Sequence, residues 1–191
     1  MSPIRNDGMT GATRVRRRPA TLAALCAPLL ASGCIYSDEP FISASDTVYP
    51  MAEKAFLVCG SESKCSYSFF KKVNGGYQSY SWNASKKVFV KEGKKYRFRK
   101  FPQQKDDIYL GQENSGSQYR LFLLIAHDKG YRAYVPPCDD DNSAMMAKLD
   151  KLGVSKCKIT PGTDPMGILG RWKSVMGEPL HATYTIYPVK Y

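Results

Sequence analysis

The chain of 191 residues carries 28 Lys and Arg against 17 Asp and Glu, a formal net charge of +11, and 43% of its residues are hydrophobic. This length and composition suit one globular domain. They exclude wholesale disorder, a collagen-like or coiled-coil rod and a polytopic membrane protein.

The N-terminal residues have the pattern of a targeting segment. Four arginines within residues 14–18 precede an apolar stretch at 20–31. This stretch is far shorter than the roughly 20 residues that a membrane-spanning helix needs. A basic region, a short apolar region and small residues after it are typical of a secretory signal peptide. We therefore expect residues 1–33 to be a signal peptide that is removed on export.

The segment Leu30-Ala31-Ser32-Gly33-Cys34 follows the apolar stretch. Small residues directly before a Cys resemble the lipobox of bacterial lipoproteins, in which the Cys thiol receives a diacylglyceryl group and the chain is cut before it. The resemblance covers residues 14–34 and implies lipidation at Cys34 and a membrane anchor. The lipobox usually has Leu where this chain has Ala31, and Ala31-Ser32-Gly33 also fits an ordinary signal-peptidase site. Plain secretion is therefore the alternative.

The residue after Cys34 is Ile35, not the Asp that retains many lipoproteins in the inner membrane. By the same resemblance, the expected location is the bacterial cell envelope, at the periplasmic face of the outer membrane. A secreted or soluble periplasmic protein is the alternative. Residues 35–50 show no hydrophobic period, so we expect 34–50 to be a lipidated N-terminus and tether. Residues 51–191 are expected to form a single periplasm-facing domain.

Short aromatic and β-branched runs follow, separated by turn residues such as Gly and Asn. The runs cover residues 55–58, 67–73, 77–82, 87–90, 95–101, 108–112, 118–126 and 131–135. Short runs with regular turns predict an antiparallel meander. The continuously apolar stretch 121–126 predicts a central strand that is covered on both faces.

The segment Lys86–Lys100 is strongly basic, and Glu92 is its only acidic residue. We expect a hairpin that turns at Glu92-Gly93 and can bind the phosphates of lipid head groups, lipopolysaccharide or nucleic acid, or an acidic protein. The candidate anion-binding residues are Lys86, Lys87, Lys91, Lys94, Lys95, Arg97, Arg99 and Lys100. The alternative, and the more frequent situation, is an edge hairpin whose lysines prevent edge-to-edge association.

The C-terminal third predicts two helices and a last strand. Asn142-Ser143 can cap a helix that stops at Gly153, and Pro165 can open an amphipathic helix that ends at Gly177. Residues 183–187 have the pattern of a strand. The sequence therefore predicts an α+β fold: a mostly antiparallel sheet or meander with one or two short C-terminal helices, stabilised by disulfides.

Four cysteines remain if Cys26 is removed with the signal peptide and Cys34 carries lipid. They are Cys59, Cys65, Cys138 and Cys157. An even number in an oxidising compartment predicts disulfides, and sequence proximity favours the pairs Cys59–Cys65 and Cys138–Cys157 among three possible pairings. A zinc site is the alternative, but the gaps of five and eighteen residues do not fit its usual spacing.

The sequence contains no G-x-S-x-G, Walker A or H-E-x-x-H motif, and its two histidines are His127 and His181. The run Asp139–Asp141 lacks the spacing of a calcium loop and suits the N-terminal end of a helix. We therefore expect no catalytic residues, no metal and no cofactor.

Together these observations predict a cell-envelope lipoprotein with a non-catalytic binding or structural role, which contacts anionic envelope components through the basic hairpin. The expected partners are the membrane, through the N-terminal lipid, and anionic lipid, lipopolysaccharide or an envelope protein. Nucleic acid is not expected, because export leaves few such partners. One alternative is an inhibitor or partner module of an envelope hydrolase, and a further one is an envelope hydrolase.

Overall fold

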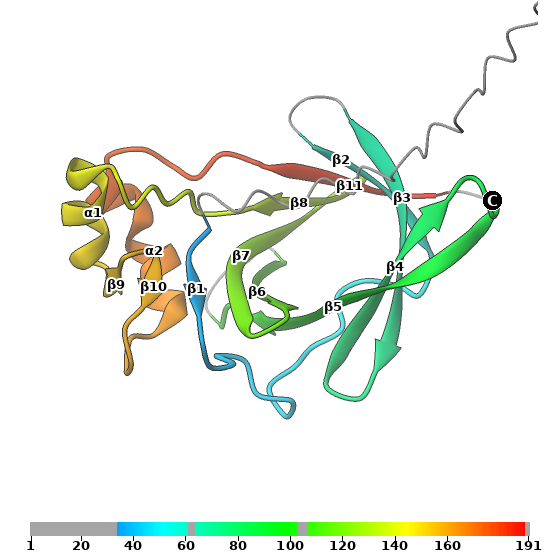
Figure 1. Ribbon diagram of the computed structural model, residues 1–191, viewed down its shortest axis with the longest axis horizontal. Coiled ribbons are helices and arrows are strands. Elements are labelled where there is room, and N and C mark those ends of the chain that lie inside the picture. Colours follow the sequence, from blue (N-terminus) through cyan, green and yellow to red (C-terminus); the bar gives the residue numbers. More distant parts are fainter. Residues whose placement is uncertain (1–33, 61–63, 103–106, 190–191) are drawn as a thin grey trace, which may run out of the picture.

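Antiparallel strands dominate the fold. The computed structural model describes residues 34–60, 64–102 and 107–189, and the signal peptide expected at 1–33 lies outside these ranges. Within the described ranges, eight strands form a closed barrel (Figure 1). They are β2 (Ala55–Gly60), β3 (Cys65–Val73), β4 (Gly76–Asn83), β5 (Val88–Lys100), β6 (Ile108–Ser115), β7 (Gln118–His127), β8 (Gly130–Tyr134) and β11 (Tyr184–Pro188).

The barrel is an up-and-down meander that a distant strand completes. Strands β2 to β8 pair in sequence order, each antiparallel to the next. Strand β11 then lies between β2 and β8 and is antiparallel to both. The predicted α+β fold is therefore wrong, because the meander closes on itself. Closure gives each of these strands a neighbour on both sides for at least part of its length, and the local sequence pattern does not contain this long-range pairing.

The remaining elements lie beside the barrel. They are β1 (Tyr36–Ser37), α1 (Ser143–Asp150), β9 (Val154–Ser155), β10 (Lys158–Ile159) and α2 (Pro165–Met176). The two predicted helices are confirmed. The Asn142 side chain accepts a hydrogen bond from the amide of Met145 at the start of α1, and Asp164 caps α2 in the same way. Helix α2 ends at Gly177, whose φ of 87° is the left-handed conformation that glycine favours.

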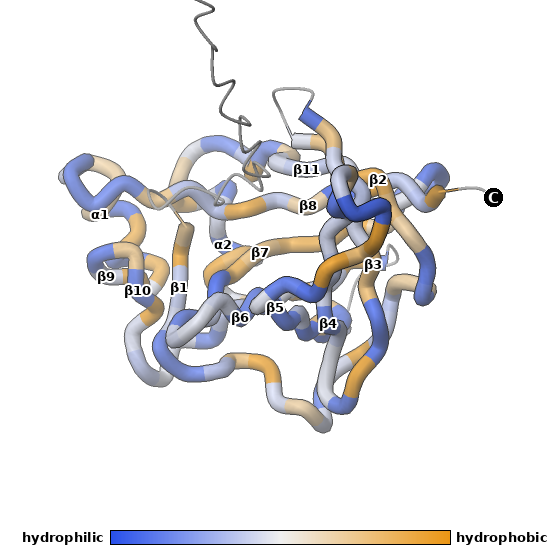
Figure 2. Tube along the Cα trace, turned by 45° about the vertical axis from the view of Figure 1, so that its right-hand side comes forward, coloured by the Kyte–Doolittle hydropathy of each residue, from blue (hydrophilic) through white to orange (hydrophobic). Residues whose placement is uncertain are grey.

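Two apolar cores share the wall formed by β6 and β7. The inner core lies inside the barrel and includes Phe56, Tyr77, Phe98 and Leu124. The outer core lies between this wall and the helices. Its members include Leu110, Leu121, Leu149, Leu152, Ile168 and Trp172. Figure 2 shows the apolar run of β7 crossing the molecule. The prediction that residues 121–126 form a strand covered on both faces is confirmed.

The segment 34–50 packs against the barrel, although we expected a tether. Ile35 and Ile42 are fully buried in the outer core. Strand β1 pairs with β7, and the side-chain amide oxygen of Gln112 accepts hydrogen bonds from the amides of Phe41 and Ile42. The local sequence shows no period here because the segment is held by scattered contacts with distant strands, not by a repeating face of its own.

Both expected disulfides are formed. Cys59–Cys65 joins the neighbouring strands β2 and β3, and Cys138–Cys157 joins the chain after β8 to the chain before β10. Each cross-link restricts the unfolded chain and so stabilises the fold. In the described ranges, no helix has both the length and the apolar character that a membrane crossing requires.

Candidate functional site

The basic segment forms one long strand, not the hairpin that we predicted. Strand β5 runs without a break from Val88 to Lys100, so the expected turn at Glu92-Gly93 is wrong. The chain reverses earlier, between the end of β4 at Asn83 and the start of β5 at Val88. The register slips within β5, because Lys95 faces Gln78 while Lys91 faces Tyr80. This slip is a β-bulge at residues 92–94.

The bulge has a specific support on the neighbouring strand. The side-chain amide of Gln78 is buried and donates to the carbonyl oxygens of Glu92 and Lys94, at 2.6 and 2.9 Å. The hydroxyl of Ser79 also donates to the Lys94 carbonyl, at 3.2 Å. These bonds satisfy backbone groups that the bulge removes from the ladder. Gly93 therefore marks a bulge, and this is why its turn-like sequence misled the prediction.

The eight predicted anion-binding residues divide into two groups. Three are engaged within the fold: Lys94 lies 3.8 Å from Glu113, Lys100 lies 2.8 Å from Asp107, and the Arg97 guanidinium donates to the carbonyls of Gly75 and Ile42. The other five are exposed and, within the described part of the chain, make no ion pair. They are Lys86, Lys87, Lys91, Lys95 and Arg99. The eight residues therefore do not form one cluster, and five of them are exposed and can contact an anionic partner.

Beyond the bulge, β4 and β5 continue as a hairpin, residues 80–91, that we call the distal ribbon, and β3 still flanks it at Tyr80 and Ser81. Strand β6 pairs with β5 only from Lys94 onward, so the distal ribbon extends past the neighbouring wall. Three of its apolar side chains are exposed: Trp82 at 40%, Val88 at 48% and Val90 at 41%. Val88 and Val90 lie on the face opposite to Trp82. The distal ribbon therefore presents apolar groups on both of its faces.

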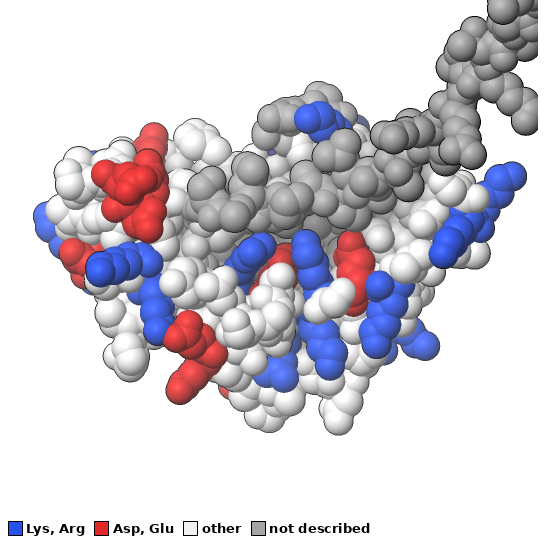
Figure 3. All heavy atoms as spheres, in the orientation of Figure 1, with Lys and Arg blue, Asp and Glu red and all other residues white. Residues whose placement is uncertain are grey.

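Aromatic rings gather on one face of the distal ribbon. The Trp82 ring lies 5.2 Å from Phe89, and Phe69 on β3 lies 6.0 Å from Phe89 and 6.1 Å from Tyr80, measured between ring centroids. Lys91 stands opposite Tyr80 in the same ladder, and Lys86 and Lys87 occupy the turn. Figure 3 shows that basic side chains are spread over the barrel strands, and that the largest group of acidic side chains lies near α1, with others scattered among the basic ones.

The barrel interior holds a second candidate site, a cavity of about 120 Å³. One end of the barrel is closed by residues 48–53: the Tyr77 hydroxyl donates to the Met51 carbonyl and the Tyr131 hydroxyl to the Pro50 carbonyl, both at 2.7 Å. The opposite end contains the polar residues Glu113 and Arg120, with their side chains directed into the cavity lining. The interior of an eight-stranded barrel is small. In some such barrels side chains fill it, and in others it holds one small ligand.

Glu113 is the central polar group of the cavity. Its side chain is buried, with an exposed fraction of 7%, and the Tyr96 hydroxyl donates to its Oε2 at 3.1 Å. Arg120 and Lys94 lie 3.6 and 3.8 Å from its Oε1. That oxygen accepts no hydrogen bond from the residues described. Burial, and then the Glu113 carboxylate, raise the pKa of Tyr96 well above its ordinary value.

Cys34, the predicted lipid acceptor, also lines the cavity at its polar end. It forms an antiparallel bridge with Pro137, just after the end of β8. Burial raises the pKa of the Cys34 thiol, and the nearby Arg120 partly opposes this effect. Cys34 therefore lies partly buried near Arg120 and Glu113, at the polar end of the cavity.

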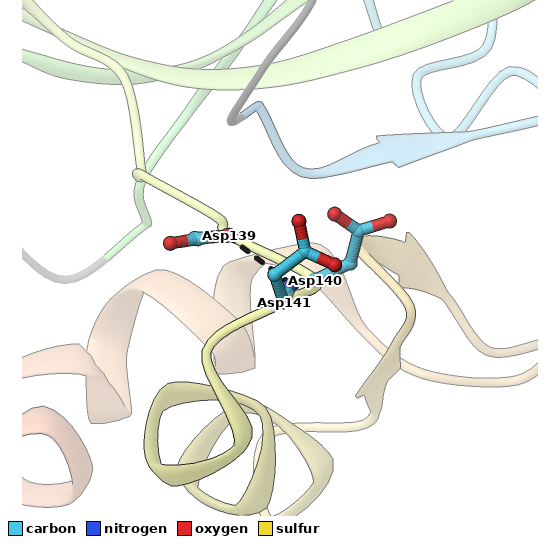
Figure 4. A group of neighbouring side chains, drawn as sticks. All are labelled: Asp139, Asp140 and Asp141. Carbon is cyan, nitrogen blue, oxygen red and sulfur yellow. Dashed lines mark hydrogen bonds between the residues drawn. The ribbon is translucent and has the colours of Figure 1, made fainter.

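Asp139, Asp140 and Asp141 lie on the loop before α1, and all three are exposed (Figure 4). The amide of Asp141 donates to Oδ1 of Asp139 at 3.2 Å, which stabilises the turn into the helix. The helix itself is capped by Asn142, as predicted, so the acidic residues occupy the three positions before the cap. His127 and His181 are exposed at separate positions in the chain.

Sequence reasoning missed Glu113 and Arg120. We expected the strand that begins at 108 to end at 112, whereas β6 continues to Ser115. Extending the alternation gives Glu113 the same inward phase as Tyr109, and pairing then places Arg120 opposite Glu113. A carboxylate in the same inward phase as Tyr109 and Gly111 was the available signal.

These features define a small, disulfide-bonded, antiparallel β-barrel with a polar group inside and a basic, aromatic extension outside. Comparison of the chain with protein-family models, with curated proteins and with solved structures gives no match. Functional argument therefore has to come from the site residues themselves.

Proposed function

We propose that this protein is a non-catalytic cell-envelope lipoprotein whose distal ribbon contacts an anionic membrane surface. The observation that carries the proposal is the combination, on residues 80–91, of exposed apolar side chains with lysines that have no acidic partner in the described residues. The membrane in question is the outer membrane, seen from the periplasm, and the lipid is carried by Cys34.

The chemistry of the distal ribbon suits a lipid interface. Trp is enriched where a membrane meets water, because its ring is apolar and its indole N–H is polar. Lys86, Lys87 and Lys91 can extend their aliphatic stems along the surface and direct their ammonium groups to phosphates. Each basic residue near an anionic leaflet contributes about 1 kcal/mol of attraction.

The barrel topology supports a shared orientation of lipid and ribbon. In an up-and-down barrel, the end of β4, the start of β5 and the end of β8 lie at the same end of the barrel. The distal ribbon extends from this end, and Cys34 is bridged to Pro137 just after β8. A lipid at Cys34 and the distal ribbon would therefore contact the same membrane. Two attachments that act together anchor a protein more stably than one.

The competing explanation is protection of a strand edge. Residues 88–91 of β5 have no neighbour on their outer side among the described residues, and lysines on such an edge prevent association with other chains. This explanation accounts for the lysines but leaves exposed Trp82, Val88 and Val90 unexplained, since apolar residues on an open edge favour association.

Vesicle binding separates the two explanations. The protein with Cys34→Ser, which removes the lipid acceptor, is mixed with vesicles of phosphatidylcholine alone or with added phosphatidylglycerol, at low and high salt. We expect binding to the anionic vesicles that weakens with salt. Replacing Lys86, Lys87 and Lys91 by Gln should weaken binding roughly a hundredfold, from about 1 kcal/mol per residue.

The matched control replaces three exposed lysines elsewhere, Lys129, Lys151 and Lys156, by Gln. Both triple variants lose the same net charge, so only a local contact distinguishes them. Equal loss of binding in the two variants, or no binding to anionic vesicles by the parent protein, would refute the membrane contact. The Trp82→Ser variant adds a second readout, because Trp82 fluorescence should shift to the blue on vesicle binding only in the parent.

Lipidation is tested by intact mass spectrometry of detergent-extracted protein with and without reduction. We expect a chain that begins at Cys34 and carries acyl groups, with four thiols that appear only after reduction. A soluble product that carries no lipid and labels with a thiol reagent before reduction would contradict the lipoprotein assignment. That outcome would leave the vesicle experiment unaffected, since it uses protein without the lipid.

A further inference from the structure

The cavity inside the barrel has a mostly apolar lining. Its apolar lining includes Val58, Phe70, Phe98, Phe122, Leu124 and Ile186. Its volume of about 120 Å³ is close to that of an engineered protein cavity of about 150 Å³ that stays dry and binds benzene. A single six-membered ring is therefore the size of ligand that this space accepts.

The polar end of the cavity supplies one acceptor that lacks a donor. Oε2 of Glu113 accepts from Tyr96, but Oε1 is buried and accepts no hydrogen bond from the described residues. Leaving a buried carboxylate oxygen in this condition is costly, and a donor on a ligand would remove the cost. Arg120 and Lys94 balance the charge of Glu113 at 3.6 and 3.8 Å without meeting the distance of a hydrogen bond.

The balance of charge selects the kind of donor. Glu113 and Arg120 line the polar end, and Lys94 lies 3.8 Å from Glu113 without lining the cavity, so these three groups carry a net positive charge and an ammonium group on a ligand would meet net repulsion. A second carboxylate would be attracted by the cations, but it would repel Glu113 and has no proton to donate to its Oε1. A neutral hydroxyl avoids both conflicts, because it can donate to Glu113 Oε1 while its oxygen accepts from a neighbouring cation.

We infer that the barrel interior is a binding site for a small apolar molecule with one hydroxyl group, of the size of a phenol, whose hydroxyl donates to Glu113 and whose ring contacts the apolar lining. This site is separate from the distal ribbon, which lies on the outside of the barrel. Each can be tested without the other.

Three probes of similar shape test the inference: phenol, benzene and benzoate. Binding to the purified protein is measured by calorimetry and by shifts of the methyl resonances of Val58, Leu124 and Ile186. We expect phenol to bind at least about tenfold more tightly than benzene, because a hydrogen bond to a charged group is worth roughly 1.5–3 kcal/mol. Benzoate should bind more weakly than phenol.

Two variants assign the binding to the cavity. Ala133→Leu adds bulk to a residue of the cavity wall and should abolish binding of phenol and benzene alike. Ala147→Leu makes the same change on the exposed face of α1 and should leave binding unchanged. Glu113→Gln keeps the side-chain shape but removes its charge, so the preference for phenol over benzene should fall several-fold while benzene affinity is retained.

Several outcomes would overturn the inference. Equal affinities of phenol and benzene would show that Glu113 does not recognise the hydroxyl, and tighter binding of benzoate would assign the site to anions. Absence of methyl shifts with millimolar phenol would exclude the site. If Ala133→Leu does not fold, as judged by circular dichroism, the ratio of phenol to benzene affinity in Glu113→Gln still decides the question.

Discussion

Gly111 on β6 shows how a single residue shapes the inner core. It pairs with Phe122 on β7, and a Cβ atom at Gly111 would lie 2.3 Å from the Phe122 ring. The ring therefore lies directly over the glycine. Because protein interiors are close-packed, an added methyl group here has no space without movement of the ring.

We expect Gly111→Ala to lower the free energy of unfolding by about 1–3 kcal/mol, the usual cost of overpacking a core. The matched control is Gly170→Ala on the exposed side of α2, where a Cβ atom meets nothing within 4 Å. That change should raise stability by up to about 1 kcal/mol, since alanine is the better helix former. Urea denaturation of the two variants measures both values, and a neutral Gly111→Ala would show that the ring is not held in place.

Tyr77 gives the barrel a dependence on alkaline pH. Burial raises the pKa of Tyr77 above the ordinary value near 10, so the phenol keeps its proton in the folded protein at a pH where the unfolded chain loses it. The folded state then binds more protons than the unfolded state. Stability is fully present below about pH 10 and falls as the pH rises further.

We expect Tyr77→Phe to flatten this decline, because phenylalanine does not titrate. The same variant should be less stable than the parent at pH 8 by about 1–3 kcal/mol, because the backbone groups of Met51 lose their bonds to the hydroxyl. Urea midpoints at pH 8 and pH 11 measure both effects. Identical pH slopes in the two proteins would disprove the assignment to Tyr77.

At the scale of the element, the bulge in β5 determines where the distal ribbon leaves the barrel. Gln78 holds two carbonyl groups of the bulge with one side-chain amide. Bulges bend the strand that contains them and increase its twist. The direction of the distal ribbon thus depends on a residue of the neighbouring strand.

Gln78→Leu keeps the approximate size of the side chain and removes both bonds. We expect a loss of about 1–3 kcal/mol in the free energy of unfolding, together with faster hydrogen exchange of the amides of residues 88–91. Ser81→Ala, on the same strand, should change stability by less than about 0.5 kcal/mol. Equal effects of the two substitutions would argue against a special role for the Gln78 amide.

Most elements could be predicted from the sequence, because their signals are local. Alternating and apolar runs predicted strands near β2, β3, β4, β6, β7, β8 and β11, and capping residues predicted α1 and α2. The two disulfide pairs followed from spacing. The division of β5 into two strands was wrong because the support for the bulge comes from Gln78, which is distant in sequence from Gly93. No local pattern predicts the short strand at Tyr36, because its partner Arg120 is distant in sequence.

At the scale of the whole molecule, the position of β11 distinguishes a closed barrel from an open sheet. The sequence showed a last strand but not that it would pair with both β2 and β8. The candidate sites depend on this pairing. Tyr184 and Ile186 of β11 complete the cavity wall, so an open sheet would have no enclosed space and no buried site for Glu113.

We expect the two cores to unfold together, because β6 and β7 contribute to both. Leu110 and Leu121 point into the outer core, and Phe122 and Leu124 into the inner core. In a Trp82→Phe variant, Trp172 is the remaining tryptophan and reports on the outer core. Its fluorescence and the far-UV circular dichroism of the strands should give the same urea midpoint. Separate midpoints would show that the helical layer unfolds independently.

The late position of β11 in the chain also has a consequence for how the protein folds. More than 120 residues separate β2 from β11, so the final pairing joins segments that are far apart along the chain. Non-local pairings of this kind are slow to form, because closing the long loop costs chain entropy before the new contacts can offset it. Until β11 is available, the chain therefore exposes the unpaired edges of β2 and β8. Unpaired strand edges promote association between chains, so this interval is when the chain is most prone to aggregation.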